Sequence, residues 1–403
     1  MSPAGRNLLS ILRAAGNDGL DPSAYFKTIR LPASASESRP AAWAAAEIAL
    51  SFALARYLDD LMRAPAGFFY VDGEVPRRKL QALSALRAIE RGVPIEDIVT
   101  DLAPPNPLYR GLKEALADHR ARRRAGAVQD SGWNELERTI LQNMDRTRAL
   151  PAMAAGRYLL VDINAARLLM IENATVRDEM RVIVGKPGEQ TPDMAGQIRF
   201  VVLNPYWNLP PDLVARRARQ VLADGPTILS SERLELLSDW SADPRRLRTD
   251  EVDWQAVAEG RQKLRVRQLP GDHNMMGKIK FMMPNRLGIY LHDTPFKEAF
   301  GRKDRRLSSG CVRVEDARRL SRWLFRGTPP RARSTSELRV DLPQPVPVYM
   351  LYLTAIPGPR GIATRPDAYD RDPRSFIMPR LSTGIDLGCC MFANQRPGEK
   401  YRS

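Results

Sequence analysis

Apolar residues recur every three or four positions through the first third of the chain, which is the period of an amphipathic helix. Two runs show it clearly: Leu80, Leu83, Leu86 and Ile89, then Leu108, Leu112 and Leu116. A proline cluster at 104–107 separates these runs, as expected where one helix ends and another begins. We therefore predict a helical domain over residues 1–126, closed by the charged, glycine-containing segment that starts at Arg120.

One more helix is predicted next, with Leu136, Ile140 and Met144 on its apolar face and Pro151 at its end. The pattern of the chain changes after it. From residue 157 apolar and polar residues alternate, and Val, Ile and Leu are frequent. Turn residues stand at Asn164 and Asn173, so the pattern predicts a meander of strands. Further strands are predicted at "GQIRFVVLNP", "LGIYLHD" and "VPVYMLYLTAI", and a helix at "EDARRLSRWLF".

The stretch from about 206 to 277 has mixed helical signals and no β pattern, so we interpret it as an insertion between two strands of one sheet. Insertions of this length in a compact domain are commonly functional covers, and we expect a lid. The predicted class is α+β. A helical domain at 1–126 precedes a mostly β domain at 127–356, and an irregular tail at 357–403 is expected to be extended or mobile.

Composition changes this picture little. The 403 residues include 62 Lys and Arg against 47 Asp and Glu, a net charge of +15, yet no nucleic-acid-binding motif accompanies the charge. The N-terminus lacks the pattern of a signal peptide. The apolar stretch from Trp43 is interrupted by Glu47, Ser51 and Arg56, so a buried amphipathic helix is favoured over a membrane contact, and no transmembrane segment is predicted.

The three cysteines, Cys311, Cys389 and Cys390, do not form a disulfide framework. A lone cysteine is usually a small buried hydrophobe. The surroundings of Cys311 favour a nucleophile instead, because "LSSGCVRVED" gives the sulfur little apolar cover. A helix predicted to begin two to four residues later and the cation of Arg313 would both lower the pKa of the thiol.

A cysteine nucleophile needs a base, and the chain has three histidines. His119 lies beside an arginine run and is expected to be solvated, and His273 lies in a predicted turn. His292 ends a predicted strand nineteen residues before Cys311, where Asp293 or its carbonyl would orient the imidazole. Ser308 or Ser309 is an alternative nucleophile using the same histidine. Scattered histidines without a CxxC pair predict no metal site.

The segment "LHDTPFKEAFGRKDRRLSSGCVRVED" resembles the active-site signature of the YkuD family of L,D-transpeptidases, a histidine followed by S-x-G-C-[VI]-R. The segments "MRVIVGKPGEQTPDMAGQIRFVVLNPYWNLPP" and "LRVRQLPGDHNMMGKIKFMMPN" resemble the YcbB-like branch of that family. "GLDPSAY" and the helices after it resemble the N-terminal scaffold domain of the same branch.

The resemblance implies acyl transfer on peptidoglycan stem peptides without a cofactor. Cys311 would attack the stem, expel D-alanine and pass the acyl group to a second stem, giving a 3→3 cross-link. His292 would be the base and then the acid, and the amides of Gly310 and Cys311 an oxyanion hole. Arg313 would hold a substrate carboxylate or pair with Glu315 or Asp316, two interpretations that stay open. The remaining candidates for the substrate cleft are Tyr290, Ser309, Trp207, Asn208 and Asp293, with a core role equally open for Trp207.

Three departures accompany the resemblance. Ser309 stands where many relatives carry histidine, and a serine at this position is common in the YcbB-like branch. Residues 120–150 leave no room for the small peptidoglycan-binding module that YcbB-like enzymes often carry, and no export signal is visible although the resemblance implies the periplasm. Three alternatives stay open: hydrolysis of the same bond by an L,D-carboxypeptidase or endopeptidase, attachment of a protein amine, or wall binding without catalysis. The resemblance also implies a carbapenem target.

Overall fold

The computed structural model describes residues 3–27, 29–32, 40–78, 82–104, 106–126, 131–151, 156–241, 243–332, 334–358 and 361–372. These residues form two compact units. The first takes those up to 179, those at 187–197 and those from 347 onwards, and the second takes 180–186 and 198–346. The chain passes from one unit to the other within single strands, so each unit is described by itself.

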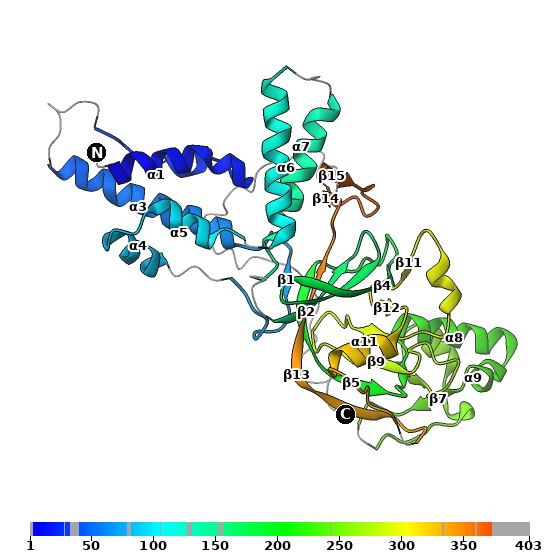
Figure 1. Ribbon diagram of the computed structural model, residues 1–403. Helices are drawn as coiled ribbons and strands as arrows, with labels where there is room; N and C mark the ends of the chain where they lie inside the picture. Colours follow the sequence, from blue (N-terminus) through cyan, green and yellow to red (C-terminus); the bar gives the residue numbers. More distant parts are fainter. Residues whose placement is uncertain are drawn as a thin grey trace. The chain divides into compact units, whose positions relative to one another are not determined.

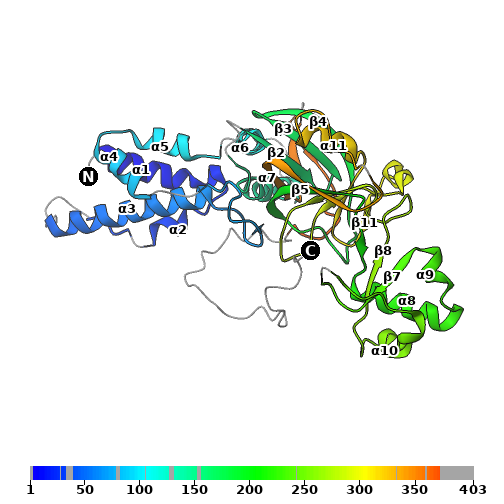
Figure 2. The ribbon, with the colours of Figure 1, turned by 90° about the horizontal axis from the view of Figure 1, so that it is seen from below.

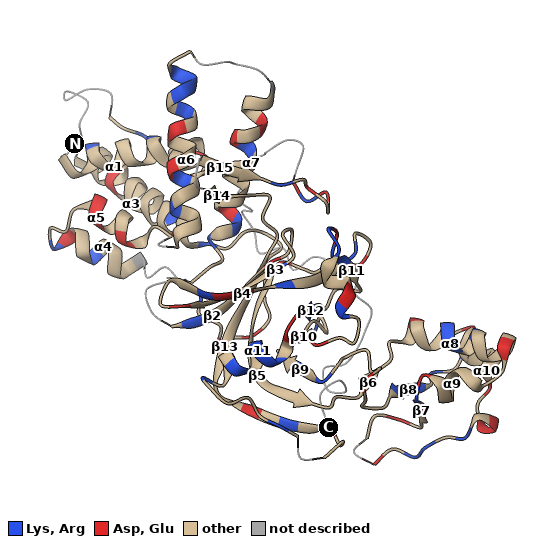
Figure 3. Cartoon of the chain, turned by 45° about the vertical axis from the view of Figure 1, so that its right-hand side comes forward, with Lys and Arg blue, Asp and Glu red and all other residues tan. Residues whose placement is uncertain are grey.

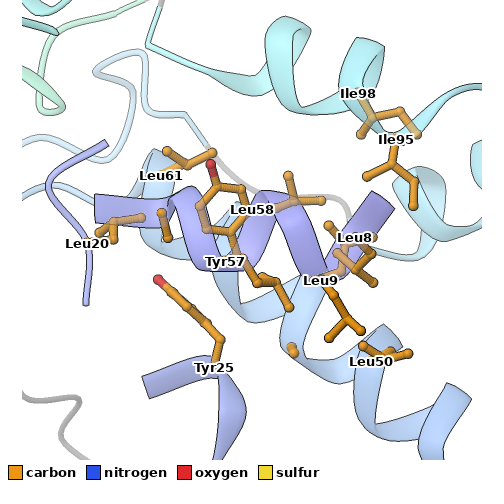
Figure 4. Close-up of a cluster of buried hydrophobic side chains, with 14 of the residues drawn as sticks. Leu8, Leu9, Leu20, Tyr25, Leu50, Tyr57, Leu58, Leu61, Ile95 and Ile98 are labelled. Carbon is orange, nitrogen blue, oxygen red and sulfur yellow. The ribbon is translucent and has the colours of Figure 1, made fainter. Parts of the chain in front are cut away.

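The first unit begins with a helical region (Figure 1). Its helices are α1 (Pro3–Arg13), α2 (Ser23–Phe26), α3 (Pro40–Met62), α4 (Ala82–Glu90), α5 (Ile95–Leu102), α6 (Pro107–Arg124) and α7 (Ser131–Thr147). Buried leucines of α1 and α3 meet Ile95 and Ile98 of α5, with Tyr25 and Tyr57 in the same cluster (Figure 4). The predicted helices at α4, α6 and α7 are confirmed.

Helix α3 is the long apolar helix predicted from the stretch at Trp43. It buries Leu50, Leu54 and Leu58 in the helical core, while Ile48 and Phe52 are exposed. By length and composition alone, α3 is also long and apolar enough to cross a membrane. That the chain has no transmembrane segment therefore stays a prediction.

Helices α6 and α7 lie side by side and share a core of their own (Figure 1). Asn106 caps α6 by accepting the Tyr109 N–H at 2.8 Å, and the arginines of its last turn, coloured blue in Figure 3, complement the helix dipole. The expectation of a solvated His119 is wrong, because its ring is buried and stacks on Trp133 with 4.1 Å between ring centroids. The domain boundary at 126/127 stays a prediction.

The strands of the first unit confirm the predicted meander. Its strands are β1 (Phe69–Tyr70), β2 (Arg157–Asp162), β3 (Arg167–Glu172), β4 (Thr175–Gly185), β5 (Met194–Leu203), β13 (Leu338–Leu351), β14 (Ala355–Gly358) and β15 (Gly361–Thr364). Three of them, β4, β5 and β13, belong to this unit over part of their length and to the second unit over the rest. Strand β2 pairs antiparallel with β3 across the turn at Asn164, and parallel with the end of β13. Asn173 turns the chain between β3 and β4 with a φ of 50°.

The expectation of an irregular tail is wrong as far as residue 372. Strands β14 and β15 form an antiparallel hairpin, and the Tyr369 ring stacks on Tyr352 at 5.0 Å between centroids. The Arg371 guanidinium then donates to Gln190, to the Thr191 carbonyl and to the Asp193 carboxylate. These contacts tie the segment to the unit. Residues 373–403, with Cys389 and Cys390, lie outside the described part of the chain.

The second unit carries the sheet that positions the candidate site. Its further strands and helix are β9 (Ile279–Met282), β10 (Leu291–His292), β11 (Arg306–Ser308), β12 (Val312–Val314) and α11 (Ala317–Leu324). Strand β9 pairs antiparallel with both β5 and β10, β10 pairs parallel with β12, and β12 pairs antiparallel with the end of β4. The pairing of β5 with β9 confirms that the insertion joins two neighbouring strands.

The insertion builds a small core of its own. It contains β6 (Trp207–Asn208), α8 (Pro211–Asp224), α9 (Thr227–Ser231), β7 (Leu234–Leu237), α10 (Trp254–Ala258) and β8 (Arg265–Gln268), and its helices gather around β7 and β8 (Figure 2). The expectation of no β structure here is wrong, because β6, β8 and β7 form a three-stranded sheet. Val214, Leu236 and Val266 pack in its centre. Closure over Cys311 stays a prediction.

Candidate active site

Cys311 lies between two short strands, at the start of β12. Gly310 before it is buried and has a φ of 103°, a left-handed conformation that glycine adopts without strain. The Ser308 hydroxyl donates to the Cys311 carbonyl at 2.6 Å, which fixes the turn from the inside. Ser308 therefore serves the backbone, and Ser309 is exposed.

The predicted helix start beside the sulfur is wrong. Residues Val312–Val314 form a strand, and α11 begins only at Ala317, where the Asp316 carboxylate caps it by accepting the Arg319 N–H at 2.9 Å. The positive end of the helix dipole therefore does not lie next to Cys311. Any stabilisation of a thiolate must come from side chains and amides on the sheet.

The register of β10 and β12 places four predicted residues on one face of the sheet. His292 pairs with Arg313, and continuing the register by one step places Tyr290 beside Cys311, whose strand neighbour Val312 donates to the Tyr290 carbonyl at 3.1 Å. Because side chains alternate along a strand, Tyr290 and His292 share a face, and so do Cys311 and Arg313. The ring centroids of Tyr290 and His292 lie 5.8 Å apart.

The sulfur of Cys311 has polar partners in a half-buried position. The backbone N–H and the hydroxyl of Tyr290 both act as hydrogen-bond partners of Sγ, and the Gly288 carbonyl accepts from the thiol at 3.5 Å. Burial raises the pKa of the Cys311 thiol, whereas Tyr290, Lys280 and Arg313 lower it. The net direction is upward, so the prediction of a lowered pKa is wrong. The resting residue is a thiol.

His292 is 2% exposed and its Nδ1 lies 2.5 Å from the Asp293 carbonyl. A carbonyl only accepts, so the proton stays on Nδ1 and Nε2 is left as the basic nitrogen. The prediction that the Asp293 carbonyl orients the imidazole agrees with this contact. Burial, followed by the charge of Arg313, lowers the pKa of His292 to about 3, so the imidazole is neutral at neutral pH.

The carboxylate of Asp293 has a different task from its carbonyl. It accepts the Lys278 backbone N–H at 2.9 Å and pairs with the Lys297 ammonium at 2.6 Å. Gly277, with a φ of 61°, leaves room for it, since a Cβ there would lie 2.5 Å from the carboxyl carbon. Asp293 is therefore braced from both sides and holds the loop after His292, rather than pointing to the sulfur.

Arg313 keeps its charge unpaired within the described residues. Glu315 is held by Arg181, through the guanidinium and the backbone N–H, and Asp316 caps α11. The buried Nε of Arg313 has no hydrogen-bond partner in that part of the chain. Of the two open interpretations, pairing with Glu315 or Asp316 is therefore not what the structure contains. A half-buried cation is left on the same face as the sulfur.

The sequence reasoning missed Lys280. It pairs with His292 in the register of β9 and β10, so its side chain emerges on the same face. Its ammonium lies 4.0 Å from the centroid of the Tyr290 ring, and burial lowers the pKa of Lys280. The alternation of "KIKF" next to the predicted "LGIYLHD" strand was the available signal, since two neighbouring strands bring their polar positions together.

The remaining candidates lie elsewhere. Trp207 belongs to β6, pairs with Gln268 of β8 and packs against the insertion core. Asn208 next to it is exposed, as is His273. These positions make Trp207 a packing residue of the insertion in this structure. A role for Trp207 or Asn208 in the cleft stays a prediction.

Two segments of the chain match models of known protein families. Residues 156–341 match a family model described as the L,D-transpeptidase catalytic domain (YkuD), and residues 1–116 match one described as a scaffold domain. A Haemophilus influenzae protein assigned as an L,D-transpeptidase is 30% identical over 285 residues, which cover 68% of this chain and 55% of that protein. The chain thus spans little more than half of that relative.

Solved structures give weaker matches. An L,D-transpeptidase from Mycobacterium smegmatis is 14% identical, with a TM-score of 0.24, over 49% of this chain and 58% of that one. A variant of the Enterococcus faecium L,D-transpeptidase is 12% identical, with a TM-score of 0.24, over 55% and 64%. TM-scores this low carry no weight beside the family models. On the sequence matches, the chain belongs to the YkuD family of L,D-transpeptidases, with its catalytic domain at residues 156–341 and a scaffold domain before it.

Proposed function

We propose that this protein is a cysteine-dependent L,D-transpeptidase that acts on peptidoglycan stem peptides, releases D-alanine and forms 3→3 cross-links. The observation that carries the proposal is the shared face of β10 and β12, on which Cys311, His292, Tyr290 and Arg313 lie together. A thiol, a neutral imidazole whose Nε2 carries no proton, and a cation without an ion pair among the described residues are the groups that acyl transfer from a carboxylate-bearing peptide requires.

Acylation begins from a neutral Cys311 thiol and a neutral His292 imidazole. The Cys311 proton moves to Nε2 of His292 as the sulfur attacks the carbonyl carbon of the third stem residue, forming a tetrahedral adduct. The amides of Gly310 and Cys311 are the proposed donors to its oxyanion. The imidazolium then returns the proton to the D-alanine nitrogen, the C–N bond breaks, and a thioester remains on Cys311.

Transfer repeats the same steps in reverse. The amine of a second stem attacks the thioester carbonyl, its surplus proton passes to Nε2 of His292, and then to the departing sulfur. Among the described residues no direct hydrogen bond joins Sγ to the imidazole. Such contacts are often long before substrate binds and tighten in the complex, so the diagonal placement of the two residues on adjacent strands suits the role.

Arg313 is the proposed carboxylate ligand. Its guanidinium lies on the catalytic face and its nearest acidic neighbours along the chain, Glu315 and Asp316, are engaged with Arg181 and α11. The donor stem ends in a D-alanine carboxylate, a planar anion that a guanidinium binds with two parallel hydrogen bonds. The proposed setting is the periplasm, where peptidoglycan lies, and the insertion is the proposed cover that keeps water from the thioester.

The test is incubation of the purified protein with disaccharide tetrapeptides, followed by mass spectrometry of the products. A cross-linked dimer that has lost one D-alanine is expected, and the variant Cys311→Ala should give none. A tripeptide monomer in place of the dimer would reassign the reaction to hydrolysis, and a product carrying a protein amine would reassign the acceptor. Unchanged substrate with folded enzyme would overturn the proposal.

A carbapenem offers an independent test of the nucleophile. Opening of the strained β-lactam ring by the sulfur should add the intact mass of the drug to the protein, on the peptide that contains Cys311. The tail cysteines, Cys389 and Cys390, have no histidine near them in the sequence and should stay unmodified. An adduct that persists in Cys311→Ala, or that sits on the tail, would remove Cys311 from the role.

A further inference from the structure

Lys280 lies on the catalytic face although the chemistry proposed above does not use it. The register places it opposite His292 on β9, and His292 in turn lies opposite Arg313 on β12. Two cations thus flank the imidazole from the two neighbouring strands. Both side chains are half-buried, so neither is screened as a surface charge would be.

The contact of Lys280 with Tyr290 is specific. Its Nζ lies 4.0 Å from the centroid of the Tyr290 ring, within the distance at which an ammonium is attracted to an aromatic face. The hydroxyl and the backbone N–H of the same tyrosine are hydrogen-bond partners of the Cys311 sulfur. Lys280, Tyr290 and Cys311 therefore form a chain of contacts that ends at the nucleophile.

The charge of the neighbouring groups leaves a task for this cation. A thiolate is normally balanced by the imidazolium of its base, but the cations around His292 and its burial hold this imidazole neutral. The groups that favour the charged sulfur are Tyr290, Lys280 and Arg313. The Glu337 carboxylate acts on Lys280 through its charge, and it also accepts the Tyr206 N–H at 2.8 Å and lies close to Arg267.

We propose that Lys280 is a positioning residue for the nucleophile: its ammonium holds the Tyr290 ring so that the hydroxyl meets the Cys311 sulfur, and supplies the positive charge that balances the sulfur when its proton leaves. The inference rests on the proposed function, because it assigns this task within the same site. In the attack step the proton passes to Nε2 of His292, and Lys280 itself neither gains nor loses a proton.

The experiment measures the pH dependence of alkylation at Cys311 by iodoacetamide, read by peptide mass spectrometry in the full chain. The variant Lys280→Met keeps the length of the side chain and removes the charge. We expect alkylation about tenfold slower at pH 7.5 and a midpoint displaced upward by about one pH unit, since one unit corresponds to a tenfold change in thiolate. Lys280→Arg should recover most of the rate, because it restores the charge over the ring.

Lys278→Met is the matched control. Lys278 is exposed, lies two positions away and pairs with Asp272, so the substitution changes the net charge by the same amount outside the site. An unchanged midpoint is expected. An equal displacement in this control would assign the effect to overall charge and overturn the proposal. An unchanged midpoint in Lys280→Met, with the variant folded by circular dichroism, would overturn it as well.

Two further measurements keep the result decisive. Should Lys280→Met fail to fold, Lys280→Gln carries the same test, with the same expected upward displacement. Tyr290→Phe removes the hydroxyl and keeps the ring, and its effect should add less than fully to that of Lys280→Met, because both act through one contact chain. Since alkylation needs no peptidoglycan, its outcome decides the role of Lys280 even if the protein forms no cross-links.

Discussion

Two polar assemblies, one in each unit, use the same residue types in opposite ways. The Asp18 cluster, defined by Asp18, Tyr57, Tyr109, Lys113 and Arg148, lies among the helices of the first unit. The hydroxyls of Tyr57 and Tyr109 donate to the Asp18 carboxylate at 3.0 and 3.1 Å, Lys113 pairs with it, and Arg148 donates to its carbonyl. Asp18 is 5% exposed, and its buried charge is fully compensated.

The two cations of the Cys311 site, Lys280 and Arg313, form no ion pair with any residue that the structure describes. The buried Nε of Arg313 has no partner among the described residues, and the Lys280 ammonium rests on an aromatic ring. Among the described residues, no carboxylate forms an ion pair with Lys280 or Arg313 as Asp18 does with Lys113, because Glu337 acts on Lys280 only through its charge and the Asp293 carboxylate pairs with Lys297. Unsatisfied charge costs stability, and folds retain it where a ligand or a reaction completes it.

The difference separates packing from function without reference to any relative. A buried tyrosine in the Asp18 cluster completes a network, whereas Tyr290 touches a nucleophile on one side and a cation on the other. Substitution in the first assembly should therefore change the free energy of unfolding, and substitution in the second should change reactivity.

Cys311→Ser should lower cross-linking by about 10⁴-fold or more, because an alkoxide forms far less readily than a thiolate and the remaining groups cannot supply a nucleophile. The melting temperature should stay close to that of the native protein, since the hydroxyl fits the half-buried site. Product formation followed by mass spectrometry checks the first part and calorimetry the second. Retained cross-linking in this variant would mean that another residue attacks the stem.

Asp18→Ala should have the largest effect on stability, about 3–5 kcal/mol, because it leaves the Lys113 ammonium and the hydroxyls of Tyr57 and Tyr109 without their carboxylate acceptor, whereas Arg148 keeps the backbone carbonyl of residue 18. Urea unfolding of the full chain measures the loss. Asp118→Ala, an exposed aspartate on α6, is the control and should stay within about 0.5 kcal/mol. If Asp18→Ala instead changed the pH dependence of Cys311 alkylation, the division between the two assemblies would not hold.

His292 should make stability depend on pH. Its pKa is about 3 in the folded protein against 6.5 as its ordinary value, so between these values the unfolded chain binds the extra proton. The free energy of unfolding should therefore fall as the pH drops from about 6.5 towards 3, by up to about 1.4 kcal/mol per unit. Urea unfolding at pH 7 and pH 5 tests this against His292→Gln, which should lose that part of the slope.

Long periodic segments were predictable from the sequence because their signal repeats. The meander from Arg157 to Gly185 has three strands with turn residues between them, and helix α6 repeats a leucine every four positions at Leu108, Leu112 and Leu116. Strands β7 and β8 of the insertion have four residues each, too few to show alternation, and were missed. The same limit made β12, with three residues, look like the approach to a helix.

The candidate site was also predictable only in part. Cys311 and His292 were predictable because their residue types and spacing are rare in this chain. The direction of the Cys311 pKa was not, because burial depends on side chains that only the folded sheet brings together. Lys280 was missed since a lysine in an alternating strand resembles any solvated position until the register places it opposite His292.

One substitution made in both assemblies gives the smallest and sharpest contrast. Tyr57→Phe and Tyr290→Phe each remove a single hydroxyl and keep the ring. The first should cost about 1 kcal/mol of unfolding free energy, the net value of a buried hydrogen bond, or somewhat more because Asp18 is charged. The second should change stability by less than about 0.5 kcal/mol, because Tyr290 is half-buried, yet it should raise the pH at which Cys311 is alkylated.

Urea unfolding and alkylation, both measured on both variants, form a two-by-two comparison. If Tyr290→Phe cost more stability than Tyr57→Phe and left alkylation unchanged, Tyr290 would be a packing residue, and the contact chain from Lys280 to the sulfur would end at its ring.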